Sequence, residues 1–300
     1  MKKQEDKNIC ISWLFRFLKY LDIVKGRSKK TIKEYERKLK KFLSWSNYLN
    51  PSKITKETIW QFRVYLNDLN LDKKTQSYYL ITIRNFLKFL RNEGLNTLDP
   101  SLIELPKIKR KEIEILSDNE LKKFLNSVDI KDNKIKSLRD KAILECLFST
   151  GLRVSELCSL DKDLDLNKRE IVIKGKGENI RIVFLSKRAV IFLKKYLNER
   201  KDNFPALFIS LSKNSFGKRL TPRAIQKIVK YYANKSGLTK KIHPHSLRHQ
   251  LATTLISRGV DIRLVQELLG HKNISTTQIY THITKPKLKE IFDKYIDKND

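Results

Sequence analysis

Apolar side chains recur at intervals of three and four residues through the first part of this 300-residue chain, and the spacing stops after Asn96. Such spacing places apolar side chains on one face of an α-helix. The pattern predicts amphipathic helices, with Ser28 as the N-cap of the second. They span Ile11–Val24, Thr31–Leu49, Thr58–Leu69 and Tyr78–Leu90. Residues 1–96 are therefore expected to form a small helical bundle.

The segment after this bundle cannot continue as a helix. Pro100 and Pro106 each lack a backbone N–H, and the run Lys107-Ile-Lys-Arg-Lys111 is strongly basic. We interpret residues 97–111 as a basic linker, which leaves residues 112–300 for a second domain.

The second domain is predicted to be helical except for one β-hairpin. Two alternating, β-rich runs, Arg169–Lys174 and Asn179–Leu185, flank a turn with two glycines, Gly175-Lys-Gly-Glu178. Helices are predicted at Asp118–Val128, Ser137–Thr150, Ala189–Arg200, Pro222–Ser236, Ser246–Arg258, Ile262–Leu269, Thr276–His282 and Lys287–Ile296. The fold class is therefore mainly α with a small β-sheet, in two domains.

The charge of the chain indicates a polyanionic partner. It carries 64 Lys and Arg against 33 Asp and Glu, a net charge of +31. Residues 1–110 hold 25 basic and 11 acidic side chains, and residues 111–300 hold 39 and 22, so both halves contribute. Nucleic acid is the first candidate, and two basic domains with a basic linker suggest a C-shaped clamp around a duplex. A Lys-rich composition from genome base bias, with a merely solvated connector, is the alternative.

Other classes fit less well. No run reaches the roughly 18 apolar residues of a membrane-spanning helix. The apolar opening at Trp13-Leu-Phe15 is broken by Arg16 and Lys19, which does not suit a secretory signal. The cysteines lack metal-ligand spacing and are expected to be reduced and buried; they are Cys10, Cys146 and Cys158. We expect a cytoplasmic protein without membrane insertion.

The chemistry-bearing residues gather late in the chain. Between Asp202 and Asp261 there is no acidic residue but there are eleven Lys or Arg, and this stretch contains His243-Pro-His-Ser-Leu-Arg-His249. All five histidines fall between residues 243 and 282. A region of this kind attracts phosphate.

Attack on a phosphodiester requires cations on its nonbridging oxygens, a nucleophile and a proton for the leaving oxygen. Arg248 lies one helical turn after His245, which places both side chains on one face. Arg153 follows the helix-breaking Gly151. Arginine donates two parallel hydrogen bonds to phosphate, although either arginine taken alone is more typical of a surface residue.

Two further side chains complete such a set. Tyr280 is a suitable nucleophile for a reaction that keeps the energy of the phosphodiester bond in a reversible covalent link between the phenol and the phosphate, rather than losing it to water. Lys176, at the hairpin tip, can protonate a leaving oxygen if neighbouring cations lower its pKa. A solvated turn lysine is the alternative, because the glycines around it do not make a phosphate-binding loop.

A zinc site is a competing interpretation of the histidines. His245 and His249 have the i,i+4 spacing of ligands on a helix, but no Glu lies between them and no carboxylate or thiol lies nearby in sequence. Imidazoles that donate to phosphate or transfer protons fit better.

These motifs, in this order and spacing, closely resemble the tyrosine recombinase (phage integrase) family, most of all its Xer branch. The motifs are Thr150-Gly-Leu-Arg-Val-Ser-Glu-Leu157, Gly175-Lys-Gly177, His245-Ser-Leu-Arg-His249 and Leu268-Leu-Gly-His-Lys-Asn-Ile-Ser-Thr-Thr-Gln-Ile-Tyr-Thr-His282. The resemblance implies a core-binding (SAM-like) DNA-binding domain at 1–96 and a catalytic domain at 112–300.

The resemblance also implies the catalytic roles, and its set is Arg153, Lys176, His245, Arg248, His271 and Tyr280. Tyr280 attacks the scissile phosphate to form a 3′-phosphotyrosyl bond and free a 5′-hydroxyl, and Lys176 is the general acid. The two arginines and His271 bind nonbridging oxygens, while His245 assists proton transfer.

Supporting roles follow from the same resemblance. Glu156 orients the site, His249 and His282 pack or support, and His243 has no assigned role. Neither a metal nor a nucleotide cofactor is implied, and no small-molecule substrate.

By the same resemblance, four protomers assemble on two double-stranded DNA segments and exchange strands through a Holliday junction. The chain acts alone or with a paralogous recombinase, and Lys287–Ile296 is the candidate helix for exchange between neighbours. Packing of this helix on its own subunit is equally compatible with its periodicity.

The implied function is site-specific recombination that resolves chromosome dimers. An integrase of a phage or mobile element would share every catalytic residue. A DNA-binding protein without catalytic activity and a metal-dependent nuclease are the alternatives from other classes.

Overall fold

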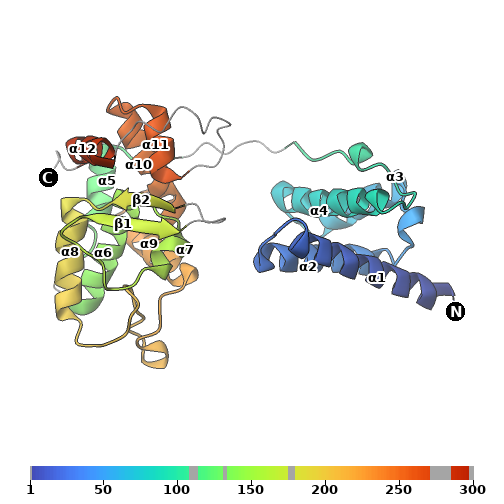
Figure 1. The fold of residues 1–300 in the computed structure, drawn as a ribbon, viewed down its shortest axis with the longest axis horizontal. Helices are drawn as coiled ribbons and strands as arrows, with labels where there is room; N and C mark the ends of the chain where they lie inside the picture. Colours follow the sequence, from blue (N-terminus) through green and yellow to red (C-terminus); the bar gives the residue numbers. More distant parts are fainter. Residues whose placement is uncertain (1, 108–113, 131–133, 175–179, 271–284, 297–300) are drawn as a thin grey trace. The chain divides into compact units, whose positions relative to one another are not determined.

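The computed structural model describes residues 2–107, 114–130, 134–174, 180–270 and 285–296. By internal contacts the chain divides into two compact units, Met1–Lys111 and Glu112–Asp300 (Figure 1). The fold class predicted from the sequence, mainly α with one small antiparallel sheet, is confirmed in the described residues.

The first unit is the predicted bundle of amphipathic helices. Its helices are α1 Lys2–Ile23, α2 Lys29–Trp45, α3 Lys56–Asp68 and α4 Lys73–Asn92, with short 3₁₀ turns at Pro51–Lys53 and Pro100–Leu102. Ser28 caps α2 as predicted, because its hydroxyl accepts a hydrogen bond from the backbone N–H of Thr31 at 3.3 Å. Helix α1 starts well before the predicted Ile11, since its polar first turns have helix-forming residues but no apolar period.

Aromatic rings fill the core of this unit. Phe17, Phe42, Phe62 and Phe86 are almost fully buried, and the rings of Phe42 and Phe62 meet edge to face with centroids 4.9 Å apart. Ile103, inside the segment interpreted as a linker, is also buried in this core. The early part of 97–111 therefore packs on the first unit, and 108–111 lie outside the described residues.

The second unit contains the remaining elements. They are α5 Asp118–Leu125, α6 Lys134–Thr150, α7 Val154–Ser159, β1 Glu170–Lys174, β2 Ile180–Phe184, α8 Lys187–Glu199, a 3₁₀ turn Lys213–Ser215, α9 Pro222–Lys235, α10 Pro244–Ser257, α11 Ile262–Leu269 and α12 Lys285–Ile296. The one-and-a-half-turn α7 was not predicted, because it is too short for an apolar period to be recognised. The predicted helix Thr276–His282 lies outside the described residues.

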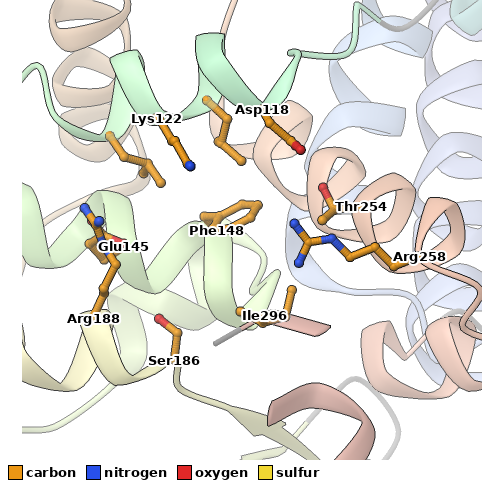
Figure 2. A pocket seen from close by; sticks show the side chains of 11 residues that line it. Asp118, Lys122, Glu145, Phe148, Ser186, Arg188, Thr254, Arg258 and Ile296 are labelled. Atoms are coloured by element: carbon orange, nitrogen blue, oxygen red, sulfur yellow. The ribbon is translucent and has the colours of Figure 1, made fainter. Parts of the chain in front are cut away.

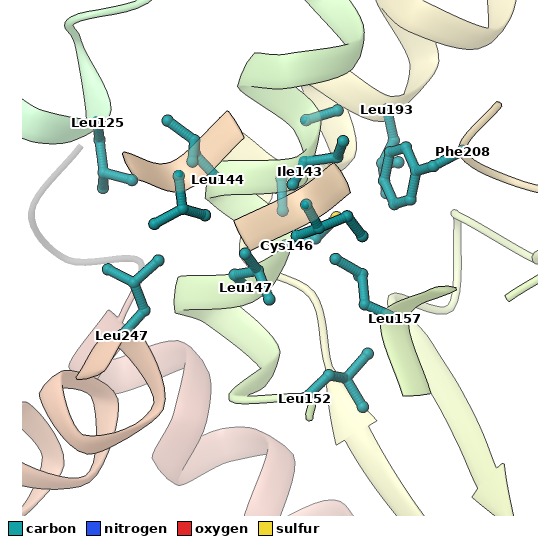
Figure 3. Packing of buried hydrophobic residues seen from close by; sticks show 14 of the residues in the cluster. Leu125, Ile143, Leu144, Cys146, Leu147, Leu152, Leu157, Leu193, Phe208 and Leu247 are labelled. Carbon is teal, nitrogen blue, oxygen red and sulfur yellow. The ribbon is translucent and has the colours of Figure 1, made fainter. Parts of the chain in front are cut away.

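Helix α6 is the centre of the second unit. It is buried on nearly every side, and Figure 3 shows its apolar side chains meeting those of Leu157, Leu193 and Leu247 from α7, α8 and α10. A helix that is buried all round shows little amphipathic contrast. Because α6 is enclosed in this way, the turn that follows it at Gly151 has a firmly held position.

The strands pair as the predicted hairpin. β1 and β2 are antiparallel, with Glu170 opposite Phe184 and Lys174 opposite Ile180. The predicted turn Gly175–Glu178, with Lys176, lies outside the described residues.

Helix α12 packs on its own unit in this chain. Phe292 is 1% exposed and lies 5.6 Å from the ring of Phe184, centroid to centroid. Asp293 accepts a 2.5 Å hydrogen bond from Arg169, and Arg258 donates to the carbonyl of Tyr295. These contacts join α12 to β2 and α10 in a small core of their own.

All three cysteines are buried free thiols, as predicted. Burial raises the pKa of Cys10 and of Cys158 to about 11, so neither is a thiolate at neutral pH. Among the described residues, no helix combines the length and apolar character that crossing a membrane requires.

Candidate functional site

Arg248 is a buried arginine anchored on two helix ends. It lies within α10 and is 3% exposed. One Nη atom donates to the carbonyl of Gly151 at 2.5 Å and the other donates to the carbonyl of Leu269, the last residue of α11. Carbonyls at helix C-termini carry partial negative charge, so they stabilise a buried cation.

Burial and the neighbouring Arg153 and Arg181 lower the pKa of Arg248 to about 10. The guanidinium is still charged at neutral pH. Its surroundings already contain other cations, and an anion placed among them would relieve the repulsion.

Arg153 is positioned by a sharp turn between two helices. Gly151 has φ +57°, and a Cβ atom there would lie 2.6 Å from a methyl of Leu269. Only glycine meets both conditions without strain. Arg153 follows as the N-cap of α7, with its side chain 49% exposed and its Nη2 3.5 Å from the carbonyl of Gly270.

Glu156 holds Arg153 in place through two hydrogen bonds. Its carboxylate accepts from the backbone N–H and from Nη1 of Arg153, both at 2.9 Å. Arg181 of β2 donates two more hydrogen bonds to the same carboxylate, at 2.6 and 3.1 Å. Burial by itself would raise the pKa of Glu156, but hydrogen bonds from Arg181 and Arg153 outweigh it and lower this pKa.

Arg181 was not recognised in the sequence. Its signal there is weak, a single arginine inside the apolar strand Ile180–Phe184. Its partner, Glu156, lies 25 positions earlier in the chain, and the alternation of a strand cannot predict a contact at that separation.

The histidines of α10 lie next to the arginines. The Nε2 atoms of His245 and His249 are 3.1 Å apart, a hydrogen-bonding distance. Burial, followed by the neighbouring His249, His243 and arginines, lowers the pKa of His245, so the ring is neutral at neutral pH. A neutral imidazole is able to accept a proton.

His243, left without a role by the sequence, is a structural cap. Its Nδ1 accepts a 2.9 Å hydrogen bond from the backbone N–H of Ser246, and Pro244 occupies the first helical position. This cap fixes the start of α10, the helix that carries His245 and Arg248.

Arg153, His245 and Arg248 line one cavity of about 890 Å³. Lys230, Lys240 and Lys241 also line it, as does the polar stripe Gln226 and Asn234 of α9. No carboxylate is among the lining residues in the described part of the chain. The cavity is therefore suited to a polyanion that places one phosphate at the arginines.

A second, smaller cavity shares no lining residue with the one at Arg153 and Arg248. It measures about 70 Å³, and Figure 2 shows side chains of α5, α6, α8 and α10 around it. Glu145 there accepts a 3.1 Å hydrogen bond from Arg188. Ile296 of α12 also lines this cavity, so its wall depends on the terminal helix.

Three predicted site residues, Lys176, His271 and Tyr280, lie outside the described residues. The described chain brings the other three together, and Glu156 with them. Within the described ranges, no group of three or more His, Cys, Asp or Glu side chains is arranged to hold a metal ion.

Two family models match the chain. The model described as "Phage integrase family" covers residues 114–287, and "Phage integrase, N-terminal SAM-like domain" covers residues 14–94. The first match spans more than half of the chain and contains every predicted site residue.

Curated relatives match along almost the full length. Tyrosine recombinase XerD of Oceanobacillus iheyensis is 41% identical, over 93% of this chain and 96% of the relative. XerD of Listeria monocytogenes serotype 4b is 38% identical, with coverage of 93% and 96%, and tyrosine recombinase XerC of Thermodesulfovibrio yellowstonii is 37% identical, with coverage of 94% and 95%.

Solved structures share the fold. XerH site-specific recombinase bound to palindromic difH substrate, in a post-cleavage complex, is 25% identical with a TM-score of 0.67 and 96% coverage of each chain. The Tn1549 transposon integrase in complex with a circular intermediate DNA has a TM-score of 0.70 at 19% identity, over 94% of this chain and 99% of the integrase. With matching family models, close full-length relatives and a shared fold, this chain belongs to the phage integrase family and is a tyrosine site-specific recombinase.

Proposed function

We propose that this recombinase cleaves and rejoins double-stranded DNA through a 3′-phosphotyrosyl intermediate and a Holliday junction. The observation that carries the proposal is the convergence of Arg153, Arg248 and His245 on one cavity, which no carboxylate of the described residues lines. Arg153 is fixed by its hydrogen bond to Glu156, and Arg248 by hydrogen bonds to the carbonyls of Gly151 and Leu269 at two helix ends. Such preorganised donors stabilise a transition state without reorganising during the reaction.

In this proposal each residue has one task. Arg153 and Arg248 bind the nonbridging oxygens of the scissile phosphate, and His271 adds a hydrogen bond. The phenolic oxygen of Tyr280 attacks phosphorus while His245 takes its proton. The bond from phosphorus to the 5′ oxygen breaks, and Lys176 gives that oxygen a proton.

The same groups serve religation in reverse. A 5′-hydroxyl from the partner strand attacks phosphorus and Lys176 takes its proton. A phosphodiester bond forms as the bond to Tyr280 breaks, and His245 returns the proton to the phenolic oxygen. As many phosphodiester bonds form as break, so the reaction requires no nucleotide to supply energy.

The DNA partner follows from charge and from the relatives. Both units carry excess positive charge, and the XerH relative is bound to its difH substrate. We propose that the chain encloses a duplex with both units and works as a tetramer on two duplexes, alone or with a paralogous recombinase. Exchange of α12 between neighbours would require release of Phe292 and Asp293 from the contacts they make within their own unit.

For the cellular role, we propose resolution of chromosome dimers in the cytoplasm. XerD and XerC relatives at 37–41% identity over nearly the full length support this role over that of a phage or mobile-element integrase. Sequencing of genomic DNA trapped covalently on the protein separates the two. A single chromosomal site indicates dimer resolution, whereas the ends of a mobile element indicate an integrase.

The experiment that tests the chemistry uses duplexes nicked near candidate crossover sites, so that a cleaved strand diffuses away and traps the intermediate. We expect the wild-type chain to form a protein–DNA adduct that resists detergent, and Tyr280→Phe to form none while binding DNA equally well. An adduct in both proteins would exclude Tyr280 as the nucleophile. DNA binding without an adduct in either would favour a non-catalytic DNA-binding protein, and activity lost with a chelator would favour a metal-dependent nuclease.

A further inference from the structure

Glu156 shares its carboxylate between two arginines. The Oε1 atom accepts from Nη1 of Arg153 at 2.9 Å and from Nη1 of Arg181 at 3.1 Å. The Oε2 atom accepts from the backbone N–H of Arg153 at 2.9 Å and from Nη2 of Arg181 at 2.6 Å. A carboxylate has about four acceptor positions, so these donors saturate it.

The two arginines differ in exposure. The side chain of Arg181 is 12% exposed and that of Glu156 is 13% exposed, whereas the side chain of Arg153 is 49% exposed. Arg181 is thus the buried partner of the carboxylate, and Arg153 is the partner that faces the cavity.

The charges explain why two arginines are needed. An arginine paired with a single carboxylate forms a neutral pair, which attracts phosphate weakly. With Arg181 present, its buried positive charge offsets the negative charge of Glu156, so the charge of Arg153 that faces the cavity is not cancelled. The carboxylate then fixes the direction of Arg153 without cancelling its charge.

Arg181 also contacts the end of α11. A Cβ atom on Gly270 would lie 2.7 Å from Cδ of Arg181 and 3.1 Å from its Nε, so only glycine allows the approach. The carbonyl of Leu269, one residue earlier, accepts from Arg248. The Nε atom of Arg181 is buried without a hydrogen-bond partner among the described residues. The side chain is therefore placed so that both Nη atoms donate to Glu156, although its third donor group stays without a hydrogen bond.

We infer that Arg181 is a positioning residue for strand cleavage, which aligns Glu156 and neutralises it so that Arg153 binds the scissile phosphate with undiminished charge. The inference rests on the proposed role of Arg153. Arg181 touches no reacting atom in this scheme and acts through Glu156.

A double-mutant cycle on nicked target DNA tests this inference. The measured quantities are the rate of covalent adduct formation at saturating protein and the DNA affinity. We expect Arg181→Met to slow adduct formation about 100-fold, as for a small misplacement of a catalytic group, with little change in affinity. Arg181→Lys keeps the positive charge but cannot donate the two parallel hydrogen bonds to Glu156, so its rate should lie between those of Arg181→Met and the wild type.

The cycle is completed by Glu156→Gln. Because a neutral glutamine needs no counter-charge, Arg181→Met should cost much less rate in the Glu156→Gln background than in the wild type. Equal losses in both backgrounds would overturn the inference. Arg200→Met is the control for loss of a buried arginine. Arg200 makes a forked pair with Asp202 in the same unit and also donates to three backbone carbonyls, but it does not line the cavity, so its loss is at least as disruptive to folding as that of Arg181. A rate loss of the same size in Arg200→Met would indicate a general effect of unfolding and also overturn the inference.

A readout without catalysis separates this inference from the proposed function. Titration of carboxyl-labelled Glu156 by carbon NMR should show its pKa rising in Arg181→Met, because burial then acts with less opposition. An unchanged pKa would refute the role of Arg181 whatever the activity. A raised pKa in a protein that forms no adduct would instead count against the proposed chemistry and leave the Arg181–Glu156 relationship in place.

Discussion

The guanidinium of Arg248 donates a 2.5 Å hydrogen bond to the carbonyl of Gly151, which lies 97 positions earlier in the chain. This bond joins the turn that presents Arg153 to the helix that presents His245. The two arginine-bearing segments are therefore joined directly, which suits two groups that bind a single phosphate in a fixed relative position.

Replacement of Arg248 should affect chemistry far more than DNA binding. We expect Arg248→Ala to reduce the rate of adduct formation by about 10²–10³-fold, because a charged donor at the transition state is lost. The affinity should fall little, since one phosphate contact among many is removed. The measurements are a gel-shift titration and single-turnover cleavage, and comparable losses in both would contradict the assignment.

The cleavage rate lost on replacement of Lys176 should be restored by a substrate with a better leaving group. We expect Lys176→Ala to cleave ordinary DNA slowly and to regain the wild-type rate on a substrate with sulfur at the 5′ bridging position, because a thiolate leaves without a proton. The check is the ratio of the two rates in variant and wild type. If the variant stays slow on the sulfur substrate, Lys176 is not the general acid.

Gly151 should tolerate no side chain. Gly151→Ala is strained by φ +57° at about 1–2 kcal/mol, and the 2.6 Å approach to Leu269 adds about 1–3 kcal/mol. Gly259→Ala in the same unit is the control, because Gly259 has φ +85° but nothing within 4 Å of its Cβ position. Chemical denaturation should show the larger loss of unfolding free energy for Gly151→Ala, and equal losses would mean that the contact with Leu269 relaxes freely.

Cleavage should persist below the ordinary pKa of histidine. Burial, then His249, His243, Arg248 and Arg153, lower the pKa of His245 from 6.5, so its neutral, proton-accepting form persists as the pH falls through that value. The acidic limb of the cleavage rate should therefore lie below pH 6.5 when measured between about pH 5 and pH 8. In His249→Gln, the neighbouring imidazole that disfavours protonation of His245 is removed, so the limb should move to higher pH. A limb that stays in place in this variant would exclude His249 from tuning His245.

Local patterns in the sequence predict much of this molecule. Apolar spacing predicted the helices of the first unit, and Ser28 was recognised as a cap because capping acts within three residues. The alternation around Gly175–Glu178 predicted the antiparallel pair β1 and β2. The motifs around Arg153 and Arg248 indicated the family, which the comparisons confirm.

Other features depend on contacts between residues far apart in sequence. The ion pair of Arg181 with Glu156 spans 25 positions, and the hydrogen bond from Arg248 to Gly151 spans 97. The role of His243 as a cap was missed because capping by an imidazole is uncommon, and α7 was missed because six residues are too few to show a period.

The sequence by itself determined most of the longer helices and the strand pair among the described residues, and which family motifs the chain carries, because periodicity and short motifs are local properties. Only the tertiary structure decided that Arg153 shares its carboxylate with a buried Arg181 and that the carbonyls of Gly151 and Leu269 hold Arg248. The physical reason is that burial, charge neutralisation and hydrogen-bond partners arise from packing between elements, and packing brings together groups that no spacing in the chain relates.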